Sequence, residues 1–192
     1  MTAVLHWVRH GPTHARGMTG WTDLPADLSD AALIARLSAH LPAQARLVSS
    51  DLIRARATAD ALAGAGRARL PDDPDLREFH FGAWEGSRFA EIEARDPEAI
   101  AAFWQRPGPS RATGGESWDM LAARVSAAAD RLAALGGQVI VVAHFGPILT
   151  QLRRARQVPV PEILAQHVEP LSVTRLRRDG AGWREETANH RP

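Results

Sequence analysis

Two short apolar runs, each leading into a histidine, place the strongest constraint on the fold of this chain. One run covers residues 3–8 and is followed by Arg9 and His10, and the other covers residues 139–143 and is followed by His144. Mainly apolar runs of five or six residues are typical of strands that are buried on both faces of a sheet. Such strands belong to parallel sheets covered by helices, so the two runs predict an α/β fold.

Segments with helical spacing of apolar residues alternate with these strands. The predicted helices cover residues 29–41, 50–64, 89–95, 97–104, 116–135 and 147–156. A further strand is predicted at 46–49, and residues 171–178 and 182–186 are expected to form a closing hairpin. Ser29 is expected to cap the first helix. The alternation predicts a three-layer α/β/α sandwich around a mostly parallel central sheet.

Composition limits the classes of function. The chain of 192 residues is long enough for one domain and too short for two ordinary ones, so we expect a single domain over residues 1–192. Cysteine is absent, which excludes disulfides, thiolate metal sites and cysteine nucleophiles, and every basic residue is Arg, which excludes a Schiff-base or P-loop lysine. A net charge of +1 gives no indication of nucleic-acid binding.

No apolar run approaches the roughly 20 residues that a membrane helix needs. The first apolar stretch is short and runs directly into charged residues, unlike the apolar core of a secretory leader. We therefore expect a cytoplasmic protein without a membrane partner.

The positions of the two histidines point to a binding site. Ligands of α/β sheets bind outside the carboxyl ends of the strands, where His10 and His144 are expected to meet if their strands are neighbours. One histidine at a strand end is most often a structural boundary residue. Two with the same placement, one of them between Arg9 and Gly11, indicate a functional site.

Phosphoryl transfer accounts for the residue types at this edge. A neutral imidazole nitrogen is a good nucleophile, and the transferred group needs fixed positive donors around its oxygens. Arg9 is a planar donor beside His10, and Thr13 offers a hydroxyl. Gly11 lets the backbone come close to a phosphate group. Arg54 is predicted in the first turn of a helix that follows a strand, from where its side chain can reach the sheet edge of His10 and His144. The alternative is that Arg54 is an ordinary solvated arginine of the helix surface.

A leaving alkoxide needs a proton from a nearby carboxylic acid. Glu78 is the favoured candidate, because its apolar and aromatic neighbours are expected to raise its pKa. Glu85 and Asp51 are the alternatives.

Five motifs together resemble the histidine phosphatase superfamily, in its phosphoglycerate-mutase-like branch. They occur in the order of the family and span nearly the whole chain, at residues 9–13, 49–59, 76–86, 115–117 and 141–144. The resemblance implies that His10 is phosphorylated and that Arg9, Arg54 and His144 hold the phosphoryl group. It also implies that Glu78 protonates the leaving group and then activates water, and that no metal or cofactor takes part.

The substrate side departs from the family pattern. Arg16 stands where the family commonly has an asparagine that contacts phosphate, and Phe145 replaces a frequent glycine and is expected to narrow the pocket. Thr19 and Gly20 resemble the substrate-side loop of the family. The predicted substrate-binding residues are Gly11, Thr13, Arg16, Thr19 and Gly20.

The favoured function is a phosphomonoesterase that acts on a small phosphorylated metabolite. The chain looks most like the α-ribazole phosphatases and broad-specificity members. A phosphoglycerate mutase is disfavoured because Phe79-His80 follows Glu78, and a phosphohistidine-protein phosphatase is disfavoured by an expected helical insertion around residues 87–106. A catalytically silent regulatory module on the same fold stays open, and so does a homodimer, since dimers occur in the family.

Overall fold

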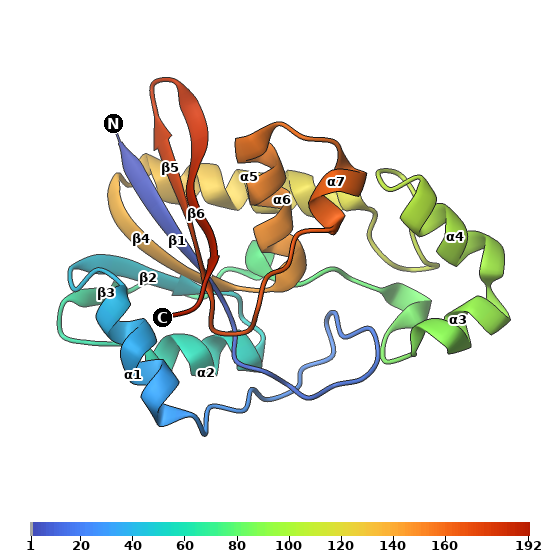
Figure 1. Cartoon of the computed structure of the whole chain (residues 1–192), viewed down its shortest axis with the longest axis horizontal. Coiled ribbons are helices and arrows are strands. Elements are labelled where there is room, and N and C mark those ends of the chain that lie inside the picture. Colours follow the sequence, from blue (N-terminus) through green and yellow to red (C-terminus); the bar gives the residue numbers. More distant parts are fainter. Residues whose placement is uncertain (1) are drawn as a thin grey trace.

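A six-stranded sheet with helices on both faces organises the chain, as seen in a computed structural model that describes residues 2–192 (Figure 1). The strands are β1 (Ala3–Arg9), β2 (Ala45–Ser49), β3 (Arg67–Arg69), β4 (Gly137–Ala143), β5 (Val173–Asp179) and β6 (Gly182–His190). The helices are α1 (Ala31–His40), α2 (Ile53–Ala61), α3 (Phe89–Arg95), α4 (Pro97–Gln105), α5 (Trp118–Ala134), α6 (Phe145–Arg156) and α7 (Val160–Leu164). Two short 3₁₀ turns, η1 (Pro74–Leu76) and η2 (Gly82–Trp84), lie between β3 and α3.

The strand order is β3-β2-β4-β1-β5-β6, and the pairs among the first four strands are parallel. β5 is antiparallel to both of its neighbours. The apolar strands β1 and β4 pair with each other at the centre, where side chains on both faces are buried. The predicted mostly parallel sheet is therefore confirmed.

Two clusters of buried side chains fill the spaces between the layers. On one face of the sheet, α1 and α2 contribute Leu33, Leu37, Ala55 and Ala59. On the other face, α5 and α6 pack against the sheet and α7 packs against α6, and their buried residues include Leu121, Val125, Ile148, Leu152 and Ile163. This arrangement confirms the predicted α/β/α sandwich.

α3 and α4 lie beside the sheet rather than on one of its faces (Figure 1). They fall within the segment expected as a helical insertion, and they attach through Ile92, Ile100 and Phe103 to the larger buried cluster. The ring of Phe103 lies 5.4 Å from that of Trp84, edge to face. In residues 2–192, no helix combines the length and the apolar character needed to cross a membrane.

The prediction that Ser29 caps the first helix is wrong. The cap is Asp30, whose carboxylate accepts a 2.9 Å hydrogen bond from the backbone N–H of Leu33, whereas the N–H of Ser29 donates to Asp27. α2 begins at Ile53 rather than at residue 50, because the N–H of Ser50 donates to Val142 and continues the strand pairing.

Two elements were not predicted. β3 is a three-residue edge strand without an apolar signal, and α7 has only five residues. Both are too short to show a period in the sequence.

We expect Asp30→Ala to lower the free energy of unfolding by about 1 kcal/mol, because it leaves an N–H of the first turn of α1 without its acceptor. Ser29→Ala is the matched control and is expected to cost less. Urea denaturation of both variants measures the difference, and an equal or larger cost for Ser29→Ala would show that the cap is assigned to the wrong residue.

Candidate active site

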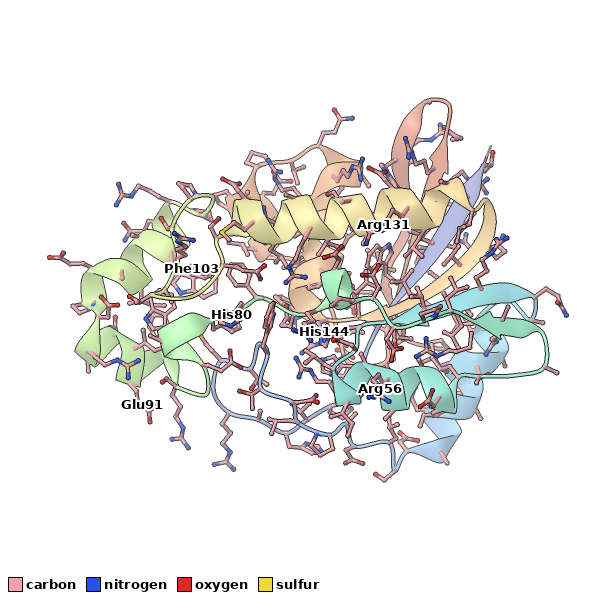
Figure 2. The ribbon with its side chains drawn as sticks, turned by 180° about the vertical axis from the view of Figure 1, so that it is seen from behind. Arg56, His80, Glu91, Phe103, Arg131 and His144 are labelled. Atoms are coloured by element: carbon pink, nitrogen blue, oxygen red, sulfur yellow. The ribbon has the colours of Figure 1, made fainter. Side chains whose placement is uncertain are left out.

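Pairing of β1 with β4 brings the two strand-end histidines together. Arg9 lies opposite Ala143, and the N–H of His10 donates to the carbonyl of Ala143 over 3.0 Å. The rings of His10 and His144 are 4.9 Å apart, edge to face. Figure 2 shows His144 in the interior, between α2 and the segment that carries His80. The structure thus brings both histidines to one edge of the sheet, as the sequence predicts.

Arg54 links the two rings from the first turn of α2. Its side chain is buried, and its Nε donates to His10 Nε2 and His144 Nδ1, each over 3.2 Å. Its two terminal nitrogens donate to the carbonyls of Gly20 and Thr22, over 2.5 and 2.9 Å. Arg54 is therefore no solvated helix arginine.

The hydrogen bonds of His10 define which of its nitrogens carries the proton. Nδ1 lies 2.6 Å from the carbonyl oxygen of Gly11, which only accepts, so Nδ1 carries the hydrogen. Nε2 then presents its lone pair toward the guanidinium of Arg54. Burial and the adjacent positive charge of Arg54 lower the pKa of His10 to about 3, which keeps the imidazole neutral.

His144 has the opposite tautomer. Its Nδ1 accepts from Arg54, so Nε2 carries the hydrogen. Burial above all holds the pKa of His144 well below its usual value. Nε2 is buried and has no hydrogen-bond partner among the described residues. A buried donor left without a partner is costly, which suits a site that receives an anion.

Arg9 is partly used by the fold. One terminal nitrogen donates to the carbonyl of Val168 over 2.6 Å, and the guanidinium lies 5.4 Å from the centre of the Phe145 ring. Its Nε is buried without a partner in the part of the chain that the structure describes. Arg9 therefore also keeps a free donor.

Gly11 has a different role from the expected one. Its N–H donates to Thr58 Oγ1 over 3.0 Å, so it is not free for a phosphate. A Cβ atom at this position would lie 2.6 Å from the side chain of Leu28. Gly11 leaves room for the following loop to pack against it, and its carbonyl orients His10.

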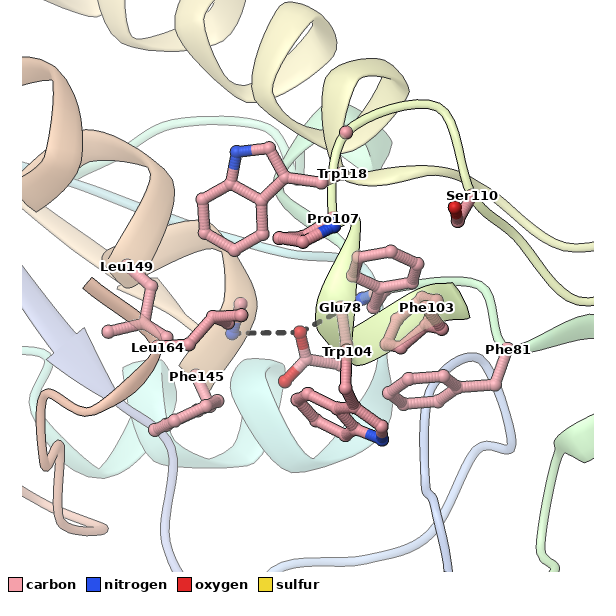
Figure 3. A pocket seen from close by; sticks show the side chains of 13 residues that line it. Glu78, Phe81, Phe103, Trp104, Pro107, Ser110, Trp118, Phe145, Leu149 and Leu164 are labelled. Atoms are coloured by element: carbon pink, nitrogen blue, oxygen red, sulfur yellow. Dashed lines mark hydrogen bonds between the residues drawn. The ribbon is translucent and has the colours of Figure 1, made fainter. Parts of the chain in front are cut away.

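Glu78 is buried beside the first turn of α6. Its Oε1 accepts from the N–H groups of Phe79 and Gly146, both over 2.9 Å (Figure 3). Burial raises the pKa of Glu78, although these two hydrogen bonds and the charges of Arg54 and Arg9 act in the opposite direction. The expected direction of the shift is confirmed.

The two alternative acids are occupied elsewhere. Glu85 Oε1 accepts from the N–H groups of Gly20 and Thr22, over 2.7 and 2.9 Å, and so holds the loop that positions Arg54. Asp51 forms a two-point ion pair with Arg77, at 2.7 and 2.5 Å, which lowers the pKa of Asp51. Both carboxylates thus hold other parts of the chain, and Glu78 remains the favoured acid.

The predicted substrate loop lies near this centre with most of its polar groups already engaged. The hydroxyl of Thr19 donates to the carbonyl of Gly17 over 3.2 Å, and both backbone groups of Gly20 bind side chains of the protein. Arg16 is exposed, and Thr13 is half-buried. No hydrogen bond within residues 2–192 fixes the side chain of Arg16 or of Thr13, and their role in substrate binding stays a prediction.

Sequence reasoning missed Arg124. From α5, this side chain donates to the backbone carbonyls of Asp75, Arg77 and Glu78, at 2.8–2.9 Å. It also pairs with both carboxylate oxygens of Glu116, at 2.7 and 2.8 Å. Arg124 is thereby a positioning residue for the segment that carries Glu78. The Gly-Glu-Ser motif at 115–117 was the available signal, but spacing alone did not identify its partner.

We expect nitrogen NMR to show His10 as the neutral Nδ1–H tautomer throughout pH 5–8. Arg54→Gln removes a neighbouring positive charge, so it is expected to raise the pKa of His10, while burial keeps this pKa below its usual value. Arg56→Gln, a change at an exposed position on the same helix, is the control and leaves the pKa unchanged. Signals that vanish in His10→Asn provide the assignment, and a protonated His10 at pH 7 would contradict the tautomer described above.

The chain is similar to members of one protein family. The family model of the histidine phosphatase superfamily (branch 1) matches residues 5–191. A bifunctional protein of Mycobacterium tuberculosis is 38% identical over 141 residues, which cover 71% of this chain and 38% of that protein. The metal-independent phosphoserine phosphatase of Arabidopsis thaliana is 35% identical over 150 residues, 72% of this chain and 63% of that protein. The chain thus spans less than two thirds of the length of these curated relatives.

A solved structure also matches nearly the whole chain. The structure of Bacillus stearothermophilus YhfR superposes with a TM-score of 0.88 at 28% sequence identity, and the match covers 98% of this chain and 97% of that one. The family predicted from the five motifs is therefore confirmed. This chain belongs to branch 1 of the histidine phosphatase superfamily.

Proposed function

We propose that this protein is a metal-independent phosphomonoesterase that hydrolyses a small phosphorylated metabolite through a phosphohistidine intermediate. The observation that carries the proposal is the contact of Arg54 Nε with both His10 Nε2 and His144 Nδ1. Around it stand two buried donors without partners among residues 2–192, Arg9 Nε and His144 Nε2. A neutral nucleophile surrounded by fixed cationic and N–H donors is what phosphoryl transfer requires.

In the first half-reaction, the lone pair of His10 Nε2 forms a bond to phosphorus, and the bond from phosphorus to the ester oxygen breaks. The carboxylic acid of Glu78 gives its proton to the departing oxygen, which leaves as an alcohol. The hydrogen bond from His10 Nδ1 to the carbonyl of Gly11 stabilises the positive charge that forms on the ring. Arg9, Arg54 and His144 neutralise the phosphoryl oxygens.

In the second half-reaction, the Glu78 carboxylate takes a proton from water, and the water oxygen attacks phosphorus. The bond from phosphorus to His10 Nε2 breaks, and inorganic phosphate leaves. His10 returns to its neutral form and Glu78 to its acid form, so no other reactant is consumed. The same carboxyl group thus acts as acid and then as base.

The side chains themselves support a mechanism without a metal. Arg9 and Arg54 supply the positive charge that a metal ion supplies in other phosphoryl-transfer sites. Within residues 2–192, no group of three or more His, Asp or Glu side chains is arranged to hold a metal ion. The relative from Arabidopsis is itself named a metal-independent phosphatase. The presence of nucleophile, cationic donors and buried acid favours an enzyme over a silent regulatory module.

We expect the protein to hydrolyse p-nitrophenyl phosphate at an undiminished rate in excess EDTA. His10→Ala abolishes turnover and the acid-labile, base-stable phosphoprotein that rapid quenching traps, because it removes the attacking nitrogen. His14→Ala, which alters an exposed loop histidine paired with Asp27, is the control and retains activity. Turnover that survives His10→Ala would refute the assignment of the nucleophile, and loss of activity in EDTA would refute metal independence.

The rate of the first half-reaction with an alkyl phosphate is expected to fall as the pH rises through the pKa of Glu78. The step needs neutral His10, whose pKa is lowered to about 3, and protonated Glu78, whose pKa is raised above its usual value. Glu78→Gln should slow this step about 10²–10⁴-fold and remove its alkaline decline.

The rapid initial release of p-nitrophenol from p-nitrophenyl phosphate, before the first phosphate is released, is the internal control for this prediction. We call it the burst. Its leaving group needs no proton, so Glu78→Gln is expected to retain the burst while the later release of phosphate slows. Equal loss of the burst and of alkyl ester cleavage would mean that Glu78 is not the acid.

A further inference from the structure

A pocket with apolar walls lies directly beside Glu78 (Figure 3). Its walls come from four parts of the chain: the segment after Glu78, α4 with the loop that follows it, the start of α5, and α6 with α7. The large side chains are Phe81, Phe103, Trp104, Trp118, Phe145 and Leu149. Apart from Glu78, the lining contains no charged residue, and Ser110 is its one hydroxyl residue.

The carboxyl group of Glu78 faces this pocket. Both of its hydrogen bonds within residues 2–192 are made by Oε1, and Oε2 points toward the space between Trp104 and Phe145 (Figure 3). The acid has to reach the oxygen that leaves phosphorus. The group attached to that oxygen therefore occupies the space next to Glu78.

Phe145 joins the pocket to the phosphoryl-binding donors. Its ring lies 5.4 Å from the guanidinium of Arg9 and also forms part of the pocket wall. An ester whose phosphoryl group lies beside Arg9 and His10 thus meets the apolar wall with its alcohol part. Phe145 thus contacts both the apolar pocket and one of the phosphoryl-binding donors.

The wall on the side of α4 is built from contacts between aromatic rings. Phe103 is buried and packs edge to face against Phe79 at 5.3 Å and against Trp84 at 5.4 Å. The next residue, Trp104, crosses Phe103 at 5.2 Å and remains 43% exposed. A ligand in the pocket covers part of this exposed apolar surface, and that burial is favourable.

On the basis of the function proposed above, we propose that this pocket binds the leaving group and selects monophosphate esters of uncharged alcohols with an apolar body the size of an aromatic ring. An apolar ring gains free energy when it leaves water for this wall. A leaving group with its own carboxylate finds no cation in the lining, so its charge is buried without a partner beside the Glu78 carboxyl group.

Comparison of benzyl phosphate with glycerol 3-phosphate and 3-phosphoglycerate tests this selectivity. All three are esters of primary alcohols, so the leaving oxygens are similar while the groups attached to these oxygens differ. We expect kcat/KM for benzyl phosphate to exceed the other values by about tenfold or more. Trp104→Ala is expected to reduce this ratio about tenfold, and Trp104→Arg to raise the relative value for 3-phosphoglycerate by supplying a cation.

Phe89→Ala is the matched control, because Phe89 is an aromatic residue of similar exposure, 48%, on neighbouring α3 and lies outside the pocket lining. It is expected to leave the ratio unchanged. Calorimetric binding of benzylphosphonate and methylphosphonate supplies a second measurement that does not need turnover. We expect the benzyl compound to bind about tenfold more tightly, and this preference to be lost in Trp104→Ala.

The outcomes separate the two proposals. Hydrolysis that depends on His10, with similar kcat/KM for all three esters and no effect of Trp104→Ala on the ratio, would overturn the leaving-group selectivity and leave the proposed function standing. Absence of turnover and of phosphohistidine would overturn the proposed function. In that case a Trp104-dependent preference for benzylphosphonate still supports the pocket, and equal binding of the two phosphonates overturns it.

Discussion

The rest of the site depends on one buried guanidinium, that of Arg54. It donates to the two histidine rings and to two backbone carbonyls, and within residues 2–192 no carboxylate forms a hydrogen bond with it. A buried positive charge that is bonded only to neutral groups is poorly compensated. The carbonyls of Gly20 and Thr22 accept hydrogen bonds from this guanidinium. The N–H groups of the same two residues donate to Glu85, which holds the loop in place. The result is a buried positive centre at the carboxyl edge of the central strands.

Burial has opposite chemical consequences for the two reacting groups. It disfavours the charged form of each group, so it lowers the pKa of His10 and raises that of Glu78. A neutral imidazole is a nucleophile, and a neutral carboxyl group is an acid. In the proposed mechanism, one physical effect therefore prepares both groups, without any ion pair between them.

Under the proposed function, the periphery of the fold determines how this centre meets a substrate. α3 and α4 lie beside the sheet, and Phe103 of α4 extends the buried cluster to the pocket beside Glu78. Arg124 fixes three backbone carbonyls of the segment that ends at Glu78. The same short stretch of chain thus contacts both a polar clamp and an apolar wall.

The sequence by itself determined the central strands, the alternation of helices around them and the family, because apolar periodicity and ordered motifs are local signals. It also placed His10, His144 and Arg54 at one edge of the sheet, since parallel strands end at a common edge, and it favoured Glu78 among three acids because of its apolar neighbours. Only the tertiary structure decided that Asp51 and Glu85 are occupied, that Asp30 is the helix cap and that Arg124 clamps the acid segment. It alone also assembled the apolar pocket, whose walls come from segments between residues 78 and 164. Such contacts join residues far apart in the chain, and packing rather than spacing selects their partners.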